Sequence, residues 1–349
     1  MKISASIHIV RKYGPYGGME RYVWELTHAL AEQGNKVKIV CEQSMSTENT
    51  NIEIIELGII SQKPRWISML RFSKRVSAYL NKADITGWVV HSHERTAKHQ
   101  VTTFHGPSIL SRKKRALDFL SPRIATWEYL EKREILNEKV QVVLPNSKLV
   151  AHTLTKLYPS VAHKLGFPAY PGVSETFYNL ATSRKSRTIG FIGKEWQRKG
   201  LMFAIEVLKP LIEQDPTIKF IVVGPAPESI SHLFSEWSNT NYELKGWKRS
   251  EDLLKEIDLL IHPAKVEPFG MVVAEANAAG IPVVISNRCG ISELINENHG
   301  KSLPLDNMTN WREEIKNQLQ NNNVKPLELT WKSLSTQHHQ LYLKIDTGS

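Results

Sequence analysis

Residues 259–275 read LLIHPAKVEPFGMVVAE, and this stretch decides the fold. Its first four residues form a short apolar run that fits a buried strand, and a glycine loop separates them from an apolar helix predicted over 271–279. The same order of strand, glycine loop and helix is found at 188–214. Repeated strand–loop–helix units indicate a parallel sheet that helices cover on both faces.

Working outward, strand-like runs alternate with helix-like stretches along the chain. Expected strands lie at 3–10, 37–41, 52–57, 88–92, 101–104, 140–144, 188–192, 220–223, 259–262 and 282–286, and expected helices at 18–33, 66–81, 123–138, 148–157, 201–214 and 271–279. A segment with proline and glycine at 166–172 interrupts the series, which then restarts. We therefore expect two doubly wound α/β domains of the Rossmann type, residues 1–165 and 166–325, that face each other across a cleft. Ligands of such sheets bind beyond the carboxyl ends of the strands, so the cleft is the expected site.

The composition excludes several protein classes. The chain has 349 residues, 41% hydrophobic and 23% charged, which is typical of a globular protein and excludes a disordered chain, a collagen or a coiled coil. No stretch approaches the roughly 18 apolar residues of a membrane-spanning helix, and the first apolar run, MKISASIHIV, is too short for a signal peptide. Two cysteines, Cys41 and Cys289, are too few for a disulfide scaffold. A reducing cytosol is therefore the expected compartment.

The positive charge lies in one half of the chain. Residues 1–170 carry 25 Lys and Arg against 14 Asp and Glu, whereas the remaining residues carry 20 against 21. This asymmetry predicts that the first half faces an anionic partner: a membrane surface, a phosphorylated substrate or nucleic acid.

Two glutamates flank the glycine loop of the deciding stretch. Glu267 precedes it, and Glu275 lies about one turn into the following helix. Both carboxylates should then border one site, where they can accept hydrogen bonds from hydroxyl groups. Between them, the backbone N–H groups of Gly270, Met271 and Val272 can receive a phosphate. The alternative is an ordinary pair of surface glutamates.

The loop after the strand at 188–192 reads GKEWQRKG over 193–200. Arg198 and Lys199 stand beside a glycine at a helix start, where cations can hold a pyrophosphate. A solvated basic turn is the alternative. The spacing differs from a Walker loop.

The first expected strand ends in a similar loop. Gly17 and Gly18 precede a helix and let a ligand approach the backbone and the free N–H groups of the helix start. A flexible turn without a ligand is the alternative.

Two histidines, His91 and His93, alternate at the end of another expected strand, as metal ligands would. With no cysteine and no third ligand evident beside them, we expect no metal there.

Two stretches of the first half combine cations with apolar residues. One is the basic run Arg112, Lys113, Lys114 and Arg115. In the other, Trp66, Met69, Leu70 and Phe72 alternate with Arg65, Arg71, Lys74 and Arg75. Both indicate surfaces for an anionic bilayer, with an ordinary solvated face as the alternative. No signature of a nucleic-acid-binding fold is present, so nucleic acid is not the expected partner.

The pattern Glu-x7-Glu, with Phe269 and Gly270 after the first glutamate, resembles family 4 of the retaining, nucleotide-sugar-dependent glycosyltransferases. This family has two Rossmann-like domains, the architecture called GT-B. Further matching motifs are Gly17-Gly18-Met19-Glu20-Arg21, Thr103-Phe104-His105-Gly106, Pro145-Asn146-Ser147, Tyr170-Pro171-Gly172-Val173 and Asp258-Leu259-Leu260-Ile261-His262-Pro263. Residues 331–345 resemble the terminal helix of the family, so residues 326–349 are expected to cross back to the first domain. The likeness is strongest to the lipopolysaccharide core glucosyltransferases.

The resemblance implies a role for each matching residue. Arg198 and Lys199 would hold the donor pyrophosphate, Glu275 the ribose hydroxyls and Glu267 the hydroxyls of the transferred sugar. Gly17 and Gly18 would approach the phosphates or the acceptor, and His105 would contact the sugar near the reacting carbon, unless it is a core histidine. Trp247 would flank the base or, equally, be a core aromatic residue. Many members have Arg where Lys194 stands here, so Lys194 is a secondary cation.

These parts predict the chemistry. Cations and N–H groups would stabilise the diphosphate that leaves, and no Asp-x-Asp motif stands at a strand end, so no metal and no other cofactor is expected. The predicted function is transfer of a hexose from a nucleotide-diphosphate sugar, UDP-linked by the resemblance, to a lipid-linked saccharide such as lipopolysaccharide core. The enzyme would be a monomer, cytoplasmic and peripheral on the inner face of the plasma membrane. The alternatives are a nucleotide-sugar 2-epimerase of the same architecture and a non-enzymatic basic membrane-binding protein.

Overall fold

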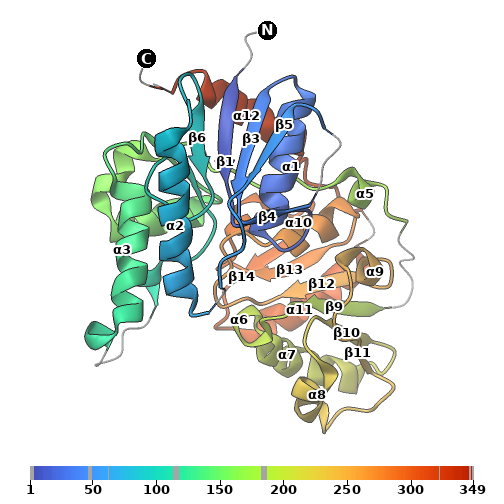
Figure 1. Cartoon of the computed structure of the whole chain (residues 1–349). Helices are drawn as coiled ribbons and strands as arrows, with labels where there is room; N and C mark the ends of the chain where they lie inside the picture. Colours follow the sequence, from blue (N-terminus) through green and yellow to red (C-terminus); the bar gives the residue numbers. More distant parts are fainter. Residues whose placement is uncertain are drawn as a thin grey trace. The chain divides into compact units, whose positions relative to one another are not determined.

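A computed structural model describes residues 4–45, 49–61, 63–112, 118–181, 187–321, 323–345 and 347 (Figure 1). The chain divides into two compact units. Unit 1 comprises Met1–Gly172 and Thr330–Ser349, and unit 2 comprises Val173–Leu329. Each unit is described by itself.

Unit 1 is built on a six-stranded sheet in the order β5-β3-β1-β6-β7-β8, and all its pairs are parallel. Its strands are β1 (Ala5–Ile9), β3 (Lys36–Cys41), β5 (Ile52–Glu56), β6 (Val89–Ser92), β7 (Val101–Phe104) and β8 (Val142–Pro145). A small parallel pair joins β2 (Lys12–Tyr13) to β4 (Gln43–Ser44). The strand order reverses its direction between β1 and β6, which is the switch point where such sheets bind ligands.

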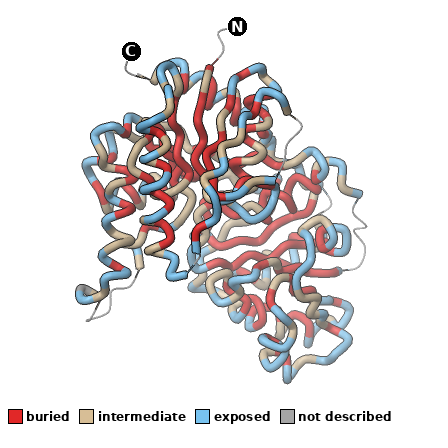
Figure 2. Tube along the Cα trace, viewed as in Figure 1, coloured by how far each residue is buried: buried red, intermediate tan, exposed pale blue. Residues whose placement is uncertain are grey.

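Helices cover both faces of this sheet, and the strands between them are buried except for the edge strand β5 (Figure 2). The helices are α1 (Met19–Glu32), α2 (Arg65–Lys82), α3 (Pro122–Leu136), α4 (Lys148–Leu157) and α12 (Trp331–Tyr342), with the short 3-10 helices η1 (Ile109–Ser111), η2 (Asp118–Leu120) and η3 (Pro159–Lys164). On one face, Ile7 and Ile9 of β1 pack with Phe72 of α2. On the other face α1 packs against α12, and both share one apolar core. Because side chains alternate along a strand, Ser6 and His8 of β1 point to this second face.

Close contacts hold α12 on unit 1. Gly172 lies so close to the start of α12 that a Cβ there would come 2.4 Å from the backbone nitrogen of Trp331. Gln33, at the end of α1, donates to the Ser335 hydroxyl at 2.8 Å. Residues far apart in the sequence thus complete one core.

Unit 2 repeats the plan with a parallel sheet in the order β11-β10-β9-β12-β13-β14. Its strands are β9 (Thr188–Ile192), β10 (Lys219–Val223), β11 (Tyr242–Leu244), β12 (Leu259–His262), β13 (Val283–Ser286) and β14 (Gly300–Leu303). Its helices are α5 (Glu175–Tyr178), α6 (Trp196–Lys199), α7 (Leu201–Gln214), α8 (Pro227–Ile230), α9 (Ser250–Leu254), α10 (Met271–Ala278) and α11 (Met308–Gln320), with η4 (Ser231–Phe234) and η5 (Gly290–Leu294). One core joins β9, β10 and β12 to α7 and α11.

The predicted α/β class with parallel sheets in two domains is confirmed. Sequence patterns missed the edge strands β11 and β14 and the helix α11. Among the helices that the structure describes, none combines the length and the apolar character that crossing a bilayer requires.

Candidate active site

In unit 2, the loop after β9 brings two cations to the end of the sheet. Gly200 has φ +85°, and a Cβ there would lie 2.0 Å from the carbonyl oxygen of Pro263, so this position requires glycine. The aliphatic part of Lys199 passes over Gly193, where a Cβ would lie 2.1 Å from Lys199 Cδ. The short helix α6 therefore holds Arg198 and Lys199 against the segment that follows β12.

Glu267 is the anion that these cations meet. Its Oε2 lies 3.3 Å from Arg198 Nη1 and 3.6 Å from Lys199 Nζ. Arg198 also donates to the carbonyl of Val266 at 2.6 Å and to Glu195 at 2.6 Å. Burial would raise the pKa of Glu267, but His262 and the two cations more than offset it and lower this pKa to about 2. Glu267 is therefore a permanent carboxylate at neutral pH.

His262, the last residue of β12, completes this cluster, and sequence reasoning gave it no role. Its Nε2 lies 3.6 Å from Glu267 Oε2, and burial lowers its pKa below the usual value. The signal that could have found it is its position, a polar residue at a strand end directly before the glutamate loop. We call Glu267, Arg198, Lys199 and His262 the charged cluster.

The backbone around Glu267 is fixed on both sides. Its N–H donates to the Arg288 carbonyl at 3.1 Å, and its own carbonyl accepts from the Gly290 N–H at 2.9 Å. Gly270 has φ +113° and is the N-cap residue of α10, where the chain turns from the loop into the helix. Its carbonyl accepts from the Val273 N–H at 3.0 Å.

The remaining predicted residues of unit 2 differ in exposure. Glu275, on α10, is 5% exposed among buried alanines, and Phe269 is buried. Met271 is half-buried, Val272 is buried and Lys194 is exposed. Trp247 is 74% exposed, so the interpretation as a core aromatic residue is wrong, and an exposed ring that could stack on a base is what the structure presents.

In unit 1, the glycine loop precedes α1 as expected. Gly17 has φ +76°, and a Cβ there would meet the carboxylate of Glu20 at 2.5 Å. Gly18 is the N-cap residue of α1, and no atom of the described residues lies within 4 Å of a Cβ at that position. Gly18 therefore leaves open space in front of the first turn.

His105 follows β7 and belongs to a series of hydrogen-bonded imidazoles. Its Nε2 lies 3.0 Å from Nδ1 of His93, and Nε2 of His93 lies 3.0 Å from Nδ1 of His8. Nε2 of His8 lies 3.1 Å from the hydroxyl of Ser6. Burial lowers the pKa of His8 and of His105 to about 3, so both rings are neutral at pH 7. We call Ser6, His8, His93 and His105 the histidine seam.

Two further hydrogen bonds hold His91 beside the histidine seam. Its Nδ1 lies 2.6 Å from the hydroxyl of Tyr342 on α12, and its Nε2 lies 2.8 Å from Thr103 on β7. The expectation that His91 and His93 lack a third possible ligand is wrong, because ring nitrogens of His8, His91 and His93 lie within 4.8 Å of one another. Sequence reasoning missed His8 because only the pairing of β1 with β6 places it opposite His91.

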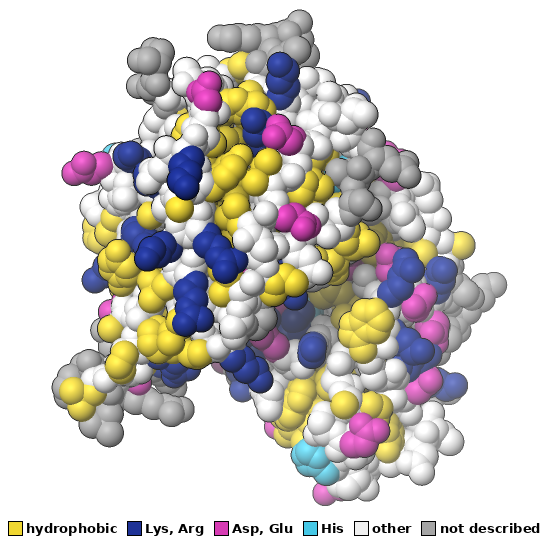
Figure 3. All heavy atoms as spheres, in the orientation of Figure 1, with side chains coloured by type: hydrophobic (Ala, Val, Ile, Leu, Met, Phe, Trp, Pro, Cys, Tyr) yellow, Lys and Arg dark blue, Asp and Glu magenta, His cyan; other side chains and the backbone are white. Residues whose placement is uncertain are grey.

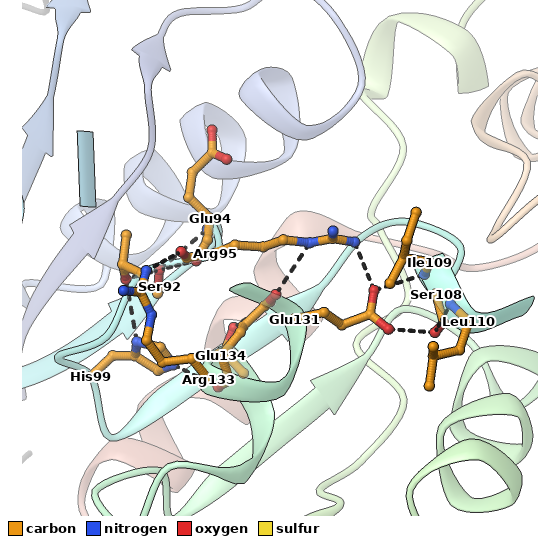
Figure 4. Close-up of polar contacts among 12 residues, drawn as sticks. Ser92, Glu94, Arg95, His99, Ser108, Ile109, Leu110, Glu131, Arg133 and Glu134 are labelled. Carbon is orange, nitrogen blue, oxygen red and sulfur yellow. Dashed lines mark hydrogen bonds and ion pairs between the residues drawn. The ribbon is translucent and has the colours of Figure 1, made fainter. Parts of the chain in front are cut away.

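The loop after His105 is held by a buried carboxylate (Figure 4). Glu131 of α3 accepts from the Ile109 N–H at 2.8 Å and from the Ser108 hydroxyl, and it pairs with Arg95 at 2.8 Å. Burial raises the pKa of the neighbouring Glu134 to about 7. This network lies behind the loop and fixes its course.

The proposed membrane residues are described only in part. Lys113, Lys114 and Arg115 lie outside the described residues, and Arg112 pairs with Asp118. On α2, Met69 and Phe72 are buried in the core of unit 1, so the expectation that they face a bilayer is wrong. The exposed cations of α2 are Arg65, Arg71, Lys74 and Arg75. Figure 3 shows Lys and Arg side chains among apolar ones on this face of unit 1.

Comparison with known proteins places both units in one class. A family model described as Glycosyltransferase Family 4 matches residues 16–166, and one described as Glycosyl transferases group 1 matches residues 186–321. An uncharacterized 42.6 kDa protein in the cps region of Klebsiella pneumoniae is 24% identical over 81% of this chain and 85% of its own length. The lipopolysaccharide glucosyltransferase WaaG of Escherichia coli K12 is 33% identical over 30% of this chain and 29% of its own length. A crystal structure of WaaG has a TM-score of 0.76 at 18% identity and covers 98% of this chain and 96% of that one.

Proposed function

Because the chain belongs to the family 4 glycosyltransferases and has their GT-B fold, we propose that it is a retaining hexosyltransferase that uses a nucleotide-diphosphate sugar. The proposed donor is UDP-linked, and the proposed acceptor is a lipid-linked saccharide such as lipopolysaccharide core. The relative named as a lipopolysaccharide glucosyltransferase supports this acceptor class. The family models set aside the non-enzymatic alternative.

The charged cluster is the observation that carries the proposal. Arg198 and Lys199 lie side by side at the end of β9, within 3.6 Å of the carboxylate of Glu267. A diphosphate can take the free donors of both cations while Glu267 accepts from sugar hydroxyls. The N-terminus of α10, at Gly270, Met271 and Val272, adds N–H groups for the phosphate charge. Glu275 would receive the ribose hydroxyls, and Trp247 would stack on the base.

The charges of Arg198, Lys199 and Glu267 support a separate role for the cations and for the carboxylate. Cleavage of the bond between sugar and diphosphate builds positive charge on the sugar and negative charge on the leaving group, which Arg198 and Lys199 stabilise. With its pKa near 2, Glu267 is too weak a base to take a proton, and we assign it to hydroxyl binding. These two cations take the place of a divalent ion, so we expect transfer to continue in the presence of EDTA.

The acceptor side is assigned to unit 1. There Gly18 leaves room at the start of α1. Gly17 and Gly18 are proposed to approach the phosphates or the acceptor, and His105 is proposed to contact the sugar. The exposed cations of α2 and the run Arg112–Arg115 are proposed to meet anionic lipid, each contributing about 1 kcal/mol near the surface. The enzyme would then act as a monomer on the inner face of the plasma membrane.

A panel of nucleoside diphosphates and their sugars tests the proposal by thermal shift. The matching nucleotide at about 100 times its Kd should stabilise the protein by about 2.7 kcal/mol. Glu275→Ala should abolish this shift, whereas Glu313→Ala, on the exposed side of α11, should retain it. A shift retained in Glu275→Ala would contradict the ribose assignment, and no shift with any nucleotide would contradict the proposal.

The 2-epimerase alternative has a separate outcome. An epimerase consumes the donor without any acceptor and releases an isomerised sugar, whereas a transferase releases the nucleoside diphosphate in proportion to the glycosylated acceptor. Product analysis with and without a lipid-linked acceptor distinguishes the two.

A further inference from the structure

The histidine seam lies on one face of the sheet of unit 1 and connects three strands. Ser6 and His8 belong to β1, His93 follows β6, and His105 follows β7. The register pairs His8 with His91 and Ser92 with Thr102. Because side chains alternate along a strand, His8, His91, His93 and His105 lie on one face, and Ser92 and Thr102 lie on the other. Tyr342 and His338 of α12 cover this face, with ring centroids 5.8 and 5.6 Å from that of His91.

Hydrogen bonding in the seam has a single direction. Each neutral imidazole has one N–H donor and one acceptor nitrogen. The Nδ1 of His8 meets the Nε2 of His93, and the Nδ1 of His93 meets the Nε2 of His105. If one ring donates from Nδ1, the next must accept at Nε2 and donate from its own Nδ1. The tautomers are therefore coupled from one end to the other.

Ser6 determines which direction is taken. Its hydroxyl is buried, and His8 Nε2 is its one hydrogen-bond partner among the residues that the structure describes. A buried hydroxyl proton without an acceptor is costly, so Ser6 donates to His8. His8, His93 and His105 must then each carry their proton on Nδ1.

His105 lies at one end of the histidine seam and is the residue assigned to contact the sugar. His105 is half-buried, its Nε2 is hydrogen-bonded to His93, and its Nδ1 makes no hydrogen bond to a residue that the structure describes. We propose that Ser6, His8 and His93 are positioning residues that fix His105 with Nδ1–H directed to the substrate, as a hydrogen-bond donor to a sugar or phosphate oxygen. This inference rests on the proposed function for the identity of the substrate, but not for the tautomers.

A metal site at the same residues is less consistent with these contacts. Both ring nitrogens of His8, His91 and His93 already have partners within 3.1 Å, so a metal ion bound to the three rings would break hydrogen bonds of each ring. The proposed role of the histidine seam keeps all of these hydrogen bonds.

The experiment is nitrogen-15 NMR of protein labelled at histidine, with resonances assigned by single His→Gln variants. In the wild type we expect His8, His93 and His105 as neutral Nδ1–H tautomers, which is the minor form of free histidine. Ser6→Ala removes the donor that sets the direction, so His8 and His105 should both shift toward the Nε2–H form. Ser4→Ala is the matched control: Ser4 is also buried at the start of this sheet, but it bonds Asn35 and His339 and should leave the tautomers unchanged.

An Nε2–H form of His105 in the wild type would overturn the proposal, and so would a Ser6→Ala spectrum with His105 unchanged. Neither NMR measurement needs a sugar donor or an acceptor, so their failure is distinct from failure of the transferase assignment.

The catalytic consequence is tested with UDP-glucose. Ser6→Ala should lower kcat about fivefold to tenfold, the effect of one neutral hydrogen bond, with KM unchanged relative to Ser4→Ala. Unchanged kcat would overturn the positioning role.

Discussion

The two units place polar side chains near the carboxyl ends of similar parallel sheets, but with different electrostatics. In unit 2, the charged cluster sets Glu267 against two cations within 3.6 Å. In unit 1, the histidine seam is uncharged at neutral pH, because burial lowers the pKa of His8 and His105 to about 3. The comparison teaches that one sheet architecture can present either fixed charge or directed neutral hydrogen bonds.

The largest expected effect comes from removing charge in unit 2. Arg198→Ala should lower kcat of sugar transfer about 100-fold or more, because a preorganised donor to the leaving group is lost. Lys209→Ala is the control, since Lys209 is a cation paired with Glu236 on the exposed side of α7. Steady-state kinetics measures both, and similar rates for the two variants would contradict the role of the charged cluster.

Acid should destabilise unit 1 more strongly than unit 2 between pH 6.5 and pH 4.5, because more buried histidines with lowered pKa values lie in unit 1. A histidine with a lowered pKa binds more protons when unfolded, so its stabilisation is complete above pH 6.5 and is lost as the pH falls toward 3. At pH 5 each such histidine, His8 or His105, costs about 2 kcal/mol. Glu267, with its pKa lowered from 4.5 to about 2, is stabilising above pH 4.5 and loses this contribution only below it.

Hydrogen exchange at pH 7.5 and pH 5 separates these contributions. Protection should fall more in β1, β6 and β7 of unit 1, where the pKa values of His8, His91, His93 and His105 are lowered, than in β9 and β12 of unit 2, where His262 alone has a lowered pKa. Equal loss in both units at pH 5 would contradict the neutral state of the seam.

The smallest effect is expected at the exposed basic surface. Neutralising Arg71 and Lys74 on α2 to Gln should weaken binding to anionic vesicles by about fivefold per residue, because each cation contributes about 1 kcal/mol. Neutralising Lys113, Lys114 and Arg115 together should weaken it further, and salt should reduce binding of the wild type. Lys209→Gln and Lys316→Gln, on the surface of unit 2, are the controls. Vesicle binding that is unchanged in both sets of variants would remove the membrane role.

The charged cluster was largely predictable from the sequence, because local motifs carry it. Glu267 follows a strand and Arg198 follows another, and adjacent parallel strands bring such loops together. The seam was not predictable in this way. His8 and His93 are 85 positions apart, and only the register between β1 and β6 makes them neighbours.

Hydrophobic patterns also gave wrong or missing predictions where one pattern fits two structures or is weak. Met69 and Phe72 fit a membrane-facing stripe as well as a core stripe, and contact with β1 decides for the core. The edge strand β11 is short and only partly buried, so its apolar pattern is weak.

The position of α12 has a consequence for synthesis. All strands of the sheet of unit 1 precede unit 2 in the sequence, yet one partner of His91 is Tyr342, which follows unit 2 and is made after it. On the ribosome, the part of the sheet face that α12 covers must therefore stay open until α12 emerges.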